Sequence, residues 1–166
     1  MRRRTALAAV AAAGIGPLQA PMHASAAQAT SDQAVAWPEV TLLDGSRLDR
    51  AALGTRPVVA VFWSTTCPFC RRHNQHVEKL HRAAAGRGLL VLGIARDRDA
   101  EKVRSYARAQ GYTFPITMDH APLAAALSSR NVIPLTVTVD RQGRLRQVIP
   151  GEMFEEDVLE LARLAG

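Results

Sequence analysis

The strongest constraint on the fold is a pair of continuous apolar runs separated by a helical pattern. The runs are PVVAVFW (57–63) and LLVLGIA (89–95). Such runs are typical of strands that are buried on both faces of a sheet. Between the runs lies a stripe of apolar residues at helical spacing: Val77, Leu80 and Ala84. A strand, a helix and a second strand predict a parallel unit with a right-handed crossover.

The remaining elements extend this unit into one domain. The segment WPEVTLLDGSRL (37–48) predicts a β-hairpin, because Asp44-Gly45 is a strong turn signal. Further elements follow in chain order: helical turns over 48–54, a helix over 98–111, a strand over 113–119, a helix over 121–129, a strand, turn and strand over 134–151, and a closing helix over 154–166. The final strand is expected to run antiparallel and complete a mixed sheet. We therefore expect an α/β domain over 37–166, with helices flanking a central mixed β-sheet and a hairpin preceding it.

The first 29 residues have the three parts of a secretory signal peptide. Arg2 to Arg4 form a charged start, an alanine-rich apolar run follows, and ASA (24–26) and AQA (27–29) are small-residue cleavage sites. We expect residues 1–29 to be removed and 30–36 to be a flexible leader. Export by the Sec or the twin-arginine route would place the protein in the periplasm, where disulfides persist. The apolar run is too short to span a bilayer, so no stable membrane insertion is expected.

Charge argues against a function in nucleic-acid binding. The formal net charge is +6, and Arg2 to Arg4 in the predicted signal peptide supply half of it. The remaining basic side chains alternate with acidic ones along the chain. Because nucleic-acid binding requires a clustered basic surface, we expect no nucleic-acid partner.

The chain has two cysteines, Cys67 and Cys70, placed where the first apolar run gives way to a helix. The unpaired N–H groups and the dipole at a helix start stabilise a thiolate, so the pKa of Cys67 should lie below that of a free cysteine. Pro68 fits the first helical turn, where its missing N–H is not needed. The pattern indicates a redox pair in which Cys67 is the exposed nucleophile and Cys70 resolves a mixed disulfide with a substrate.

Two other interpretations of the pair stay open at this point. The cysteines could be unpaired structural thiols, or they could join His73 in a zinc or copper site. A site that adds His76 is disfavoured, because four ligands at three-residue steps sweep around one helix and cannot converge on one ion. A peroxidase is disfavoured as well, since the positions before Cys67 lack the Pro and Thr of a peroxidatic cysteine.

Four segments carry a family resemblance in their order and spacing. They are LLDGSRLDRAALGTRPVVAVFWSTTCPFCRRH (42–73), LLVLGIARD (89–97), GYTFPITMD (111–119) and IPLTVTVDRQGRLRQVIPG (133–151). From about Trp37 to the C-terminus, the chain resembles the TlpA/ResA-like exported thiol–disulfide oxidoreductases, which have a thioredoxin-like fold and a redoxin-type domain. The resemblance implies three catalytic residues, Cys67, Cys70 and Pro134. It also implies three substrate-binding residues, Ile133, Pro68 and Phe69.

The resemblance further implies that Pro134 is a cis-proline beside the cysteine pair. About one X-Pro bond in twenty is cis in folded proteins, so this expectation depends on the resemblance alone. Backbone groups exposed at Ile133 and Pro134 would then pair with an extended substrate chain, a form of strand addition.

The chain departs from the family pattern near the cysteines. Thr66 stands where Trp usually precedes the first cysteine, and Gln75 replaces a proline that usually kinks the helix. The acidic position after the second core strand corresponds to Arg98, flanked by Asp97 and Asp99, either of which could substitute.

Single aromatic and histidine residues are assigned mostly to the core or the surface. We expect Trp63 to pack in the core next to the cysteines, and His81 to be half-buried. His73 could tune Cys70, but a solvated position on the helix face is the preferred interpretation.

The sequence therefore predicts an exported protein-disulfide oxidoreductase that reduces client proteins, with cytochrome c maturation as a hypothesis. The expected partners are client proteins with cysteine pairs and an upstream electron donor, a membrane thiol reductase; no cofactor or metal is expected. The alternatives are a thiol oxidase, or a copper or zinc delivery protein that uses Cys67, Cys70 and His73.

The expected direction of electron flow depends on the surroundings of the pair. Arg71, Arg72 and Arg98 favour the Cys67 thiolate, which makes the couple more oxidising, while the dry surroundings provided by Val61 act the other way. The predicted potential is about −180 to −270 mV.

Overall fold

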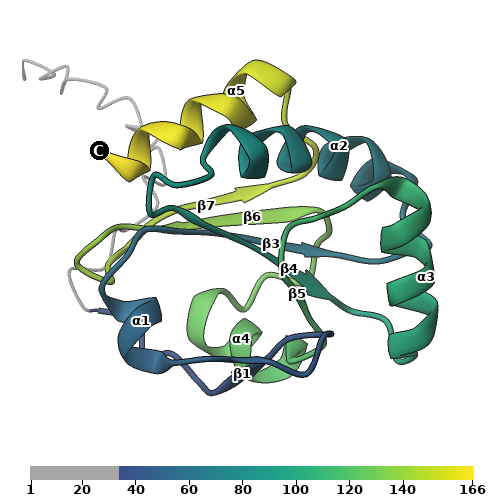
Figure 1. Cartoon of the computed structure of the whole chain (residues 1–166), viewed down its shortest axis with the longest axis horizontal. Helices are drawn as coiled ribbons and strands as arrows, with labels where there is room; N and C mark the ends of the chain where they lie inside the picture. Colours follow the sequence, from purple (N-terminus) through teal and green to yellow (C-terminus); the bar gives the residue numbers. More distant parts are fainter. Residues whose placement is uncertain (1–33) are drawn as a thin grey trace, which may run out of the picture.

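The computed structural model describes residues 34–166. The predicted signal peptide (1–29) and the first part of the predicted leader lie outside the described residues. Figure 1 shows a central sheet with helices on both faces. No helix within the described part of the chain is both long enough and apolar enough to cross a bilayer.

The sheet has five strands in the order β5-β4-β3-β6-β7. The strands are β3 (Val58–Trp63), β4 (Leu90–Ala95), β5 (Ile116–Thr117), β6 (Leu135–Val139) and β7 (Leu145–Pro150). Strands β3, β4 and β5 are parallel, while β6 runs antiparallel to both of its neighbours. The mixed sheet is confirmed.

The strand that runs against the direction of β3 is β6. The sequence predicted that the last strand would do so, and that prediction is wrong, because β7 runs in the direction of β3. Leu135 at the start of β6 pairs with Phe62 near the carboxyl end of β3. The connection from β5 therefore enters the sheet at the end from which β3 leaves, and β6 must run back along β3. A hairpin then returns β7 in the direction of β3.

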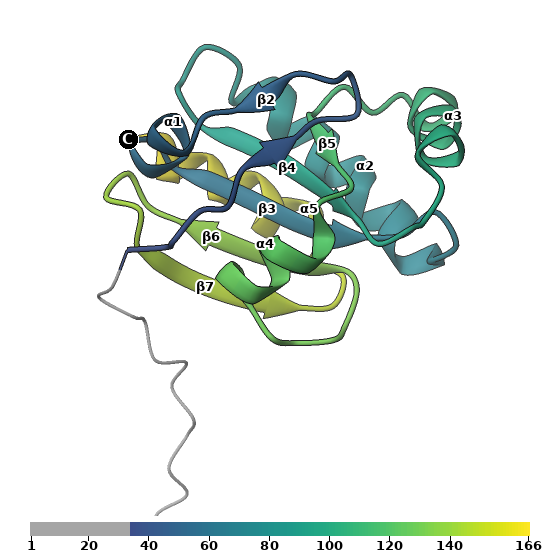
Figure 2. The same ribbon diagram turned by 90° about the horizontal axis from the view of Figure 1, so that it is seen from below.

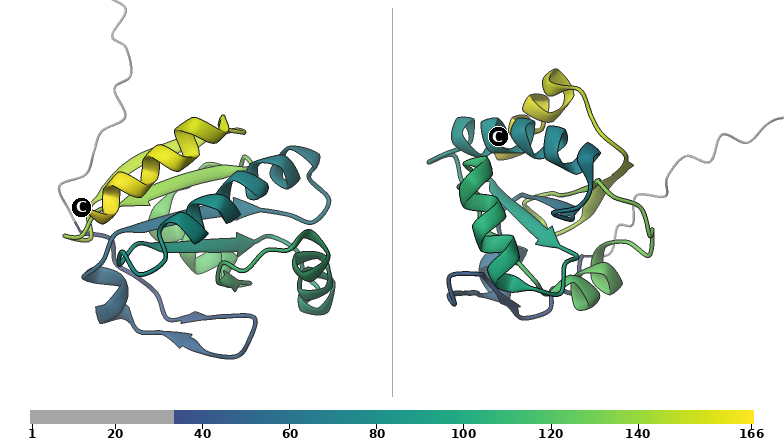
Figure 3. Two further views of the ribbon diagram at one scale, coloured as in Figure 1. Left: turned by 45° about the horizontal axis from the view of Figure 1, so that its top comes forward. Right: turned by 90° about the vertical axis from the view of Figure 1, so that its right-hand side faces the viewer.

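Two layers of helices cover the sheet. On one face lie α2 (Pro68–Ala83) and α5 (Glu155–Glu160), which pack against each other, and α3 (Ala100–Gln110) stands at the β4 side. On the opposite face lie α1 (Arg50–Gly54) and α4 (His120–Leu127), as Figure 2 shows from below. The two views in Figure 3 show α2 and α5 crossing the same face of the sheet.

The continuous apolar run in β3 is explained by this sandwich. Alternate residues Val59, Val61 and Trp63 enter the core beneath α2 and α3. Their neighbours Val58, Ala60 and Phe62 enter the core shared with α1, α4 and the N-terminal hairpin. All six side chains are buried. Both faces of this strand are thus covered, which confirms the prediction of a doubly buried strand.

Helix ends follow the local signals in the sequence. The Asp99 carboxylate accepts hydrogen bonds from the backbone N–H of Glu101 and Lys102, as expected of an N-cap. Gly111 ends α3 with φ of 72°, a left-handed conformation that favours glycine. The closing helix is shorter than predicted, because the segment Leu161–Ala165 continues as a 3-10 helix.

The N-terminal hairpin is formed by β1 (Val40–Thr41) and β2 (Arg47–Leu48) and packs beside β5. Leu42 pairs with Thr117, and the Leu43 N–H donates to the carbonyl of Ile116 at 2.8 Å. The hairpin therefore covers the β5 edge of the sheet.

Candidate active site

Cys67 and Cys70 form a disulfide at the start of α2. Cys67 is the N-cap of the helix and is partly exposed, while Cys70 lies one turn further and is fully buried. The Cys67 Sγ accepts a hydrogen bond from the Cys70 backbone N–H at 3.1 Å. Pro68 occupies the first helical turn. A thiolate on Cys67 would keep this donor and the favourable end of the helix dipole.

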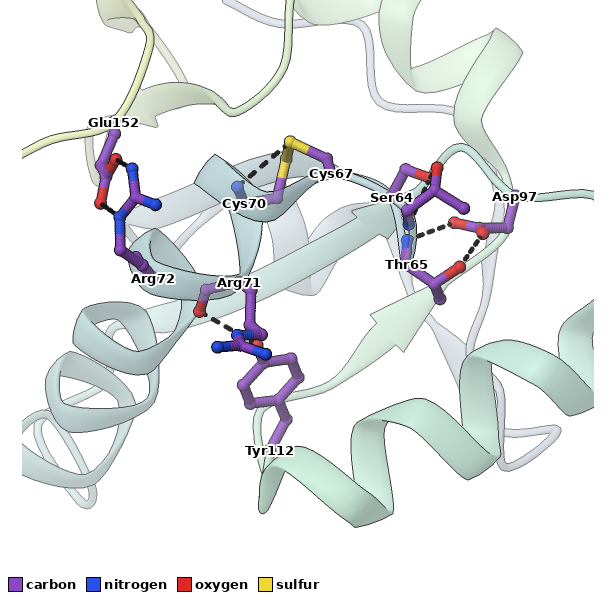
Figure 4. Close-up of a disulfide and its surroundings, with 10 residues drawn as sticks. Ser64, Thr65, Cys67, Cys70, Arg71, Arg72, Asp97, Tyr112 and Glu152 are labelled. Atoms are coloured by element: carbon purple, nitrogen blue, oxygen red, sulfur yellow. Dashed lines mark hydrogen bonds and ion pairs between the residues drawn. A yellow bond between two sulfur atoms is a disulfide. The ribbon is translucent and has the colours of Figure 1, made fainter.

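The loop before Cys67 is held by Asp97, which follows β4. One carboxylate oxygen of Asp97 accepts from the Thr65 N–H at 3.0 Å, and the other accepts from the Thr65 hydroxyl at 2.5 Å. Cys67 continues this turn through its N–H, which donates to the Ser64 carbonyl at 3.3 Å. Figure 4 shows Asp97 and Thr65 facing each other next to the disulfide. Of the two aspartates considered from the sequence, Asp97 is the one at this loop, since Asp99 caps α3.

The Ile133–Pro134 peptide bond is cis, as the resemblance implied. Pro134 directly precedes β6, so this bond lies at the end of the sheet from which the Cys67 loop departs. The Pro134 carbonyl accepts from the Gly151 N–H at 2.8 Å. Phe69 and Val132 expose 55% and 38% of their surface, so apolar groups are available to a partner on both segments.

The two arginines after Cys70 differ in their electrostatic environment. The Arg72 guanidinium binds Glu152 through two hydrogen bonds of 2.8 and 2.6 Å and lies 5.1 Å from the centre of the Phe69 ring. The hydrogen bond to Arg72 lowers the pKa of Glu152. Because Glu152 compensates its charge, Arg72 contributes less to the Cys67 thiolate than the sequence suggested.

The preferred interpretation of His73 as a solvated residue is wrong, because its side chain is fully buried. Its Nε2 lies 3.0 Å from the Thr136 hydroxyl, and its Nδ1 accepts from the Met153 N–H at 3.3 Å. Burial lowers the pKa of His73 to about 4, so the ring is neutral at pH 7. The sequence could not show this, because the residue that covers His73 comes from a segment 80 positions away.

In this arrangement the candidate metal ligands His73, Cys67 and Cys70 are already engaged in other contacts. Both ring nitrogens of His73 have partners, and the two sulfurs are bonded to each other. Across residues 34–166, no three His, Cys, Asp or Glu side chains are grouped closely enough to hold a metal ion.

Trp63 is fully buried beside α3, as predicted, and belongs to an aromatic cluster. Its ring centre is 5.9 Å from those of both Tyr106 and Tyr112, and Tyr112 stacks on Phe114 at 5.2 Å. The Tyr112 hydroxyl donates to the Arg71 carbonyl at 3.3 Å. The cluster thereby connects the first turns of α2 to the segment after α3.

A thioredoxin-like fold with a CxxC disulfide at the junction of a central strand and a helix defines a thiol–disulfide oxidoreductase. The chain belongs to the Redoxin family, whose family model matches residues 29–163.

Named relatives and solved structures are of the same class. The chain is 26% identical to the thiol-disulfide oxidoreductase ResA of Halalkalibacterium halodurans, over 74% of this chain and 69% of that protein. It is 28% identical to ResA of Geobacillus kaustophilus over 58% of this chain, and that match spans only 56% of the relative. A secreted thiol-disulfide isomerase from Corynebacterium glutamicum superposes with a TM-score of 0.70 at 26% identity, covering 79% of this chain and 84% of the other. A thiol:disulfide interchange protein from Chlorobium tepidum gives a TM-score of 0.71 at 24% identity, covering 81% and 98%.

Proposed function

We propose that this protein reduces disulfides in client proteins outside the cytoplasm. The observation that carries the proposal is the unequal burial of the pair, with Cys67 partly exposed at the helix start and Cys70 fully buried. A client sulfur can reach Cys67, whereas Cys70 is shielded from all but its neighbour. Two sulfurs in this arrangement can act as attacking and resolving thiols.

The reaction transfers two electrons from the dithiol form to the client. The Cys67 thiolate attacks one sulfur of a client disulfide, which forms a mixed disulfide and releases the other client sulfur as a thiolate. The Cys70 thiolate then attacks Cys67 Sγ, which restores the disulfide seen here and releases the reduced client. An upstream thiol donor must return two electrons to the pair for the next cycle, and a membrane thiol reductase fits that role.

Client binding is assigned to the surface around Cys67. Among the described residues, no backbone hydrogen bond engages Ile133. We expect its N–H and carbonyl to pair with an extended client segment. Pro68 and Phe69 are exposed on the adjacent helix start and would contact the apolar side chains of that segment.

The local charges support the reductive direction. The compensation of Arg72 by Glu152 removes one group that would stabilise the thiolate and make the pair more oxidising. Cys70 lies in an apolar cluster with Val61 and Val77, where a thiolate is disfavoured. We retain an expected potential of about −180 to −270 mV.

Export is supported by the charge, apolar and small-residue order of residues 1–29. The relative from Corynebacterium glutamicum is described as secreted. Mass spectrometry of the protein purified from its native host should find a chain that begins after Ala26 or Ala29. A soluble cytosolic protein that retains Met1 would contradict export to the periplasm, and clients such as apocytochromes would then be excluded.

Trapping variants test the roles of the cysteines. Cys70→Ala should accumulate mixed disulfides with clients, and Cys67→Ala should accumulate none. Equal trapping by both variants would contradict the assigned roles.

Equilibration with glutathione gives the redox potential of the pair. A value near −120 mV, with rapid oxidation of unfolded dithiol clients, would make the protein a thiol oxidase. Stoichiometric copper or zinc that blocks disulfide formation would instead favour metal delivery.

A further inference from the structure

A second surface next to Cys67 has features of a binding site. It is an open cavity of about 390 Å³ between the loop before α2, the first turns of α2, and α3. Its walls include Thr65, Thr66, Cys67, Arg71, Tyr106 and Gln110. Ile133 and Val132 do not line it, so the cavity is distinct from the surface assigned to the client backbone.

Arg71 lines this cavity and brings a positive charge to it. Along residues 34–166, no carboxylate lies within 4.0 Å of the Arg71 guanidinium, in contrast to Arg72, which is bound by Glu152. Figure 4 shows the two arginines leaving α2 in different directions, Arg72 toward Glu152 and Arg71 toward Tyr112. An anion in the cavity would therefore meet a charge that forms no close ion pair within residues 34–166.

Two neutral groups add hydrogen-bond capacity. The Gln110 Oε1 accepts from the Gln75 side chain at 3.4 Å, which leaves the Gln110 amide N–H groups as donors. The Tyr106 hydroxyl is protonated at pH 7, because the ordinary pKa of tyrosine is about 10, and burial raises it further. The Arg71 guanidinium opposes this shift, as expected of a charge close to that hydroxyl.

One acidic side chain lies near the cavity. Asp97 contributes to raising the pKa of Tyr106, which places its negative charge in the vicinity. Both of its oxygens already accept hydrogen bonds from Thr65. Asp97 is thus directed at the loop, while Arg71, Tyr106 and Gln110 line the open space.

We propose that this cavity binds a carboxylate of the molecule that is joined to Cys67 in the mixed disulfide. The preferred substrates are then polypeptides in which an acidic residue stands next to the reacting cysteine. This inference depends on the proposed function and adds a substrate preference to it.

Two disulfide-bonded peptides that differ only in Glu or Gln beside the cysteine provide the test. The measured quantity is kcat/KM for reduction of each peptide by the dithiol form of the full chain. The wild type should favour the Glu peptide by about threefold to fivefold at low ionic strength, as for an exposed ion pair, and the ratio should fall as salt is added.

Substitutions at two adjacent arginines separate the cavity from general electrostatics. Arg71→Gln should bring the ratio close to one, and Arg71→Lys should restore part of it. The matched control, Arg72→Gln, removes the same net charge one residue away and should keep the wild-type ratio. An equal ratio in wild type and Arg71→Gln, or an equal loss in both glutamine variants, would overturn the proposal. If neither peptide is reduced by the wild type, the proposed function fails and this inference fails with it.

Discussion

Asp97 accepts both of its close hydrogen bonds from one residue, Thr65, whose N–H and hydroxyl each reach a separate carboxylate oxygen. The two residues are 32 positions apart and connect the end of β4 to the loop that carries Cys67. The position of the attacking sulfur therefore depends on a contact between two neighbouring strand ends.

A double-mutant cycle should detect this contact. Asp97→Ala removes both hydrogen bonds, whereas Thr65→Ala removes only the one from the hydroxyl, since alanine keeps the backbone N–H. Each variant should lower the free energy of unfolding by about 1–2 kcal/mol. Because both variants break the same contact, the double variant should cost less than the sum of the singles, by about 1 kcal/mol. Urea unfolding of the oxidised protein gives these values. Glu101→Gln, on the exposed face of α3, should change stability by less than about 0.5 kcal/mol, and strict additivity at Asp97 and Thr65 would contradict the coupling.

Two buried threonines on β6 differ in whether their hydroxyl has a partner. The Thr136 hydroxyl lies 3.0 Å from His73 Nε2, whereas the Thr138 hydroxyl is buried without a hydrogen bond. Thr136→Val should destabilise the protein by about 1–3 kcal/mol, because the His73 nitrogen is left unsatisfied. Thr138→Val should be neutral or stabilising. Denaturant midpoints decide between them, and equal effects at both positions would show that the His73 contact adds nothing.

His73 should make the stability depend on pH in mild acid. Burial lowers its pKa in the folded state to about 4, from an ordinary value of 6.5. Between these two pKa values His73 is protonated in the unfolded chain but neutral in the folded chain. The free energy of unfolding therefore falls as the pH drops from about 6.5 toward 4. Between pH 7 and 5 the expected loss is about 2 kcal/mol. His73→Gln should flatten this part of the profile, and an unchanged slope in that variant would refute the assignment.

Gly93 marks a close approach between β4 and the aromatic cluster. A Cβ at this position would lie 2.7 Å from the Phe114 ring and 3.0 Å from Trp63 Nε1. Gly93→Ala should therefore destabilise the protein by about 1–3 kcal/mol through overpacking. The control is Gly54→Ala in α1, where a Cβ meets no atom within 4 Å, and it should be neutral or slightly stabilising. Thermal unfolding of both variants provides the comparison.

The sequence predicted the elements well because their signals are local. A few adjacent residues determine each of three features: the burial of both faces of β3, the start of α3 at Asp99 and the end of α3 at Gly111. The disulfide also follows from adjacent residues, since CxxC at a strand-to-helix junction places both sulfurs on one helical turn.

The contacts that the sequence did not reveal join distant segments. Arg72 and Glu152 are 80 positions apart, and so are His73 and Met153. Both contacts arise because the segment between β7 and α5 passes over one side of α2. Nothing near residues 71–73 indicates this cover, so the helix face there could be taken as solvated. The reversal of β6 has the same origin, because it depends on where a long connection re-enters the sheet.

The contact of the N-terminal hairpin with β5 has a consequence for how copies of this protein meet one another. With that edge covered, β7 is the strand of the described sheet that keeps an open row of backbone groups. The edge is ill suited to recruit another chain. Pro150 lacks an N–H, and the register of β7 with β6 is irregular at Arg146, which lies between the paired residues Leu145 and Gln147. Arg146 also places a charged side chain on the strand. Pairing of two molecules through their sheets, a common first step toward aggregation, is thereby discouraged on both sides.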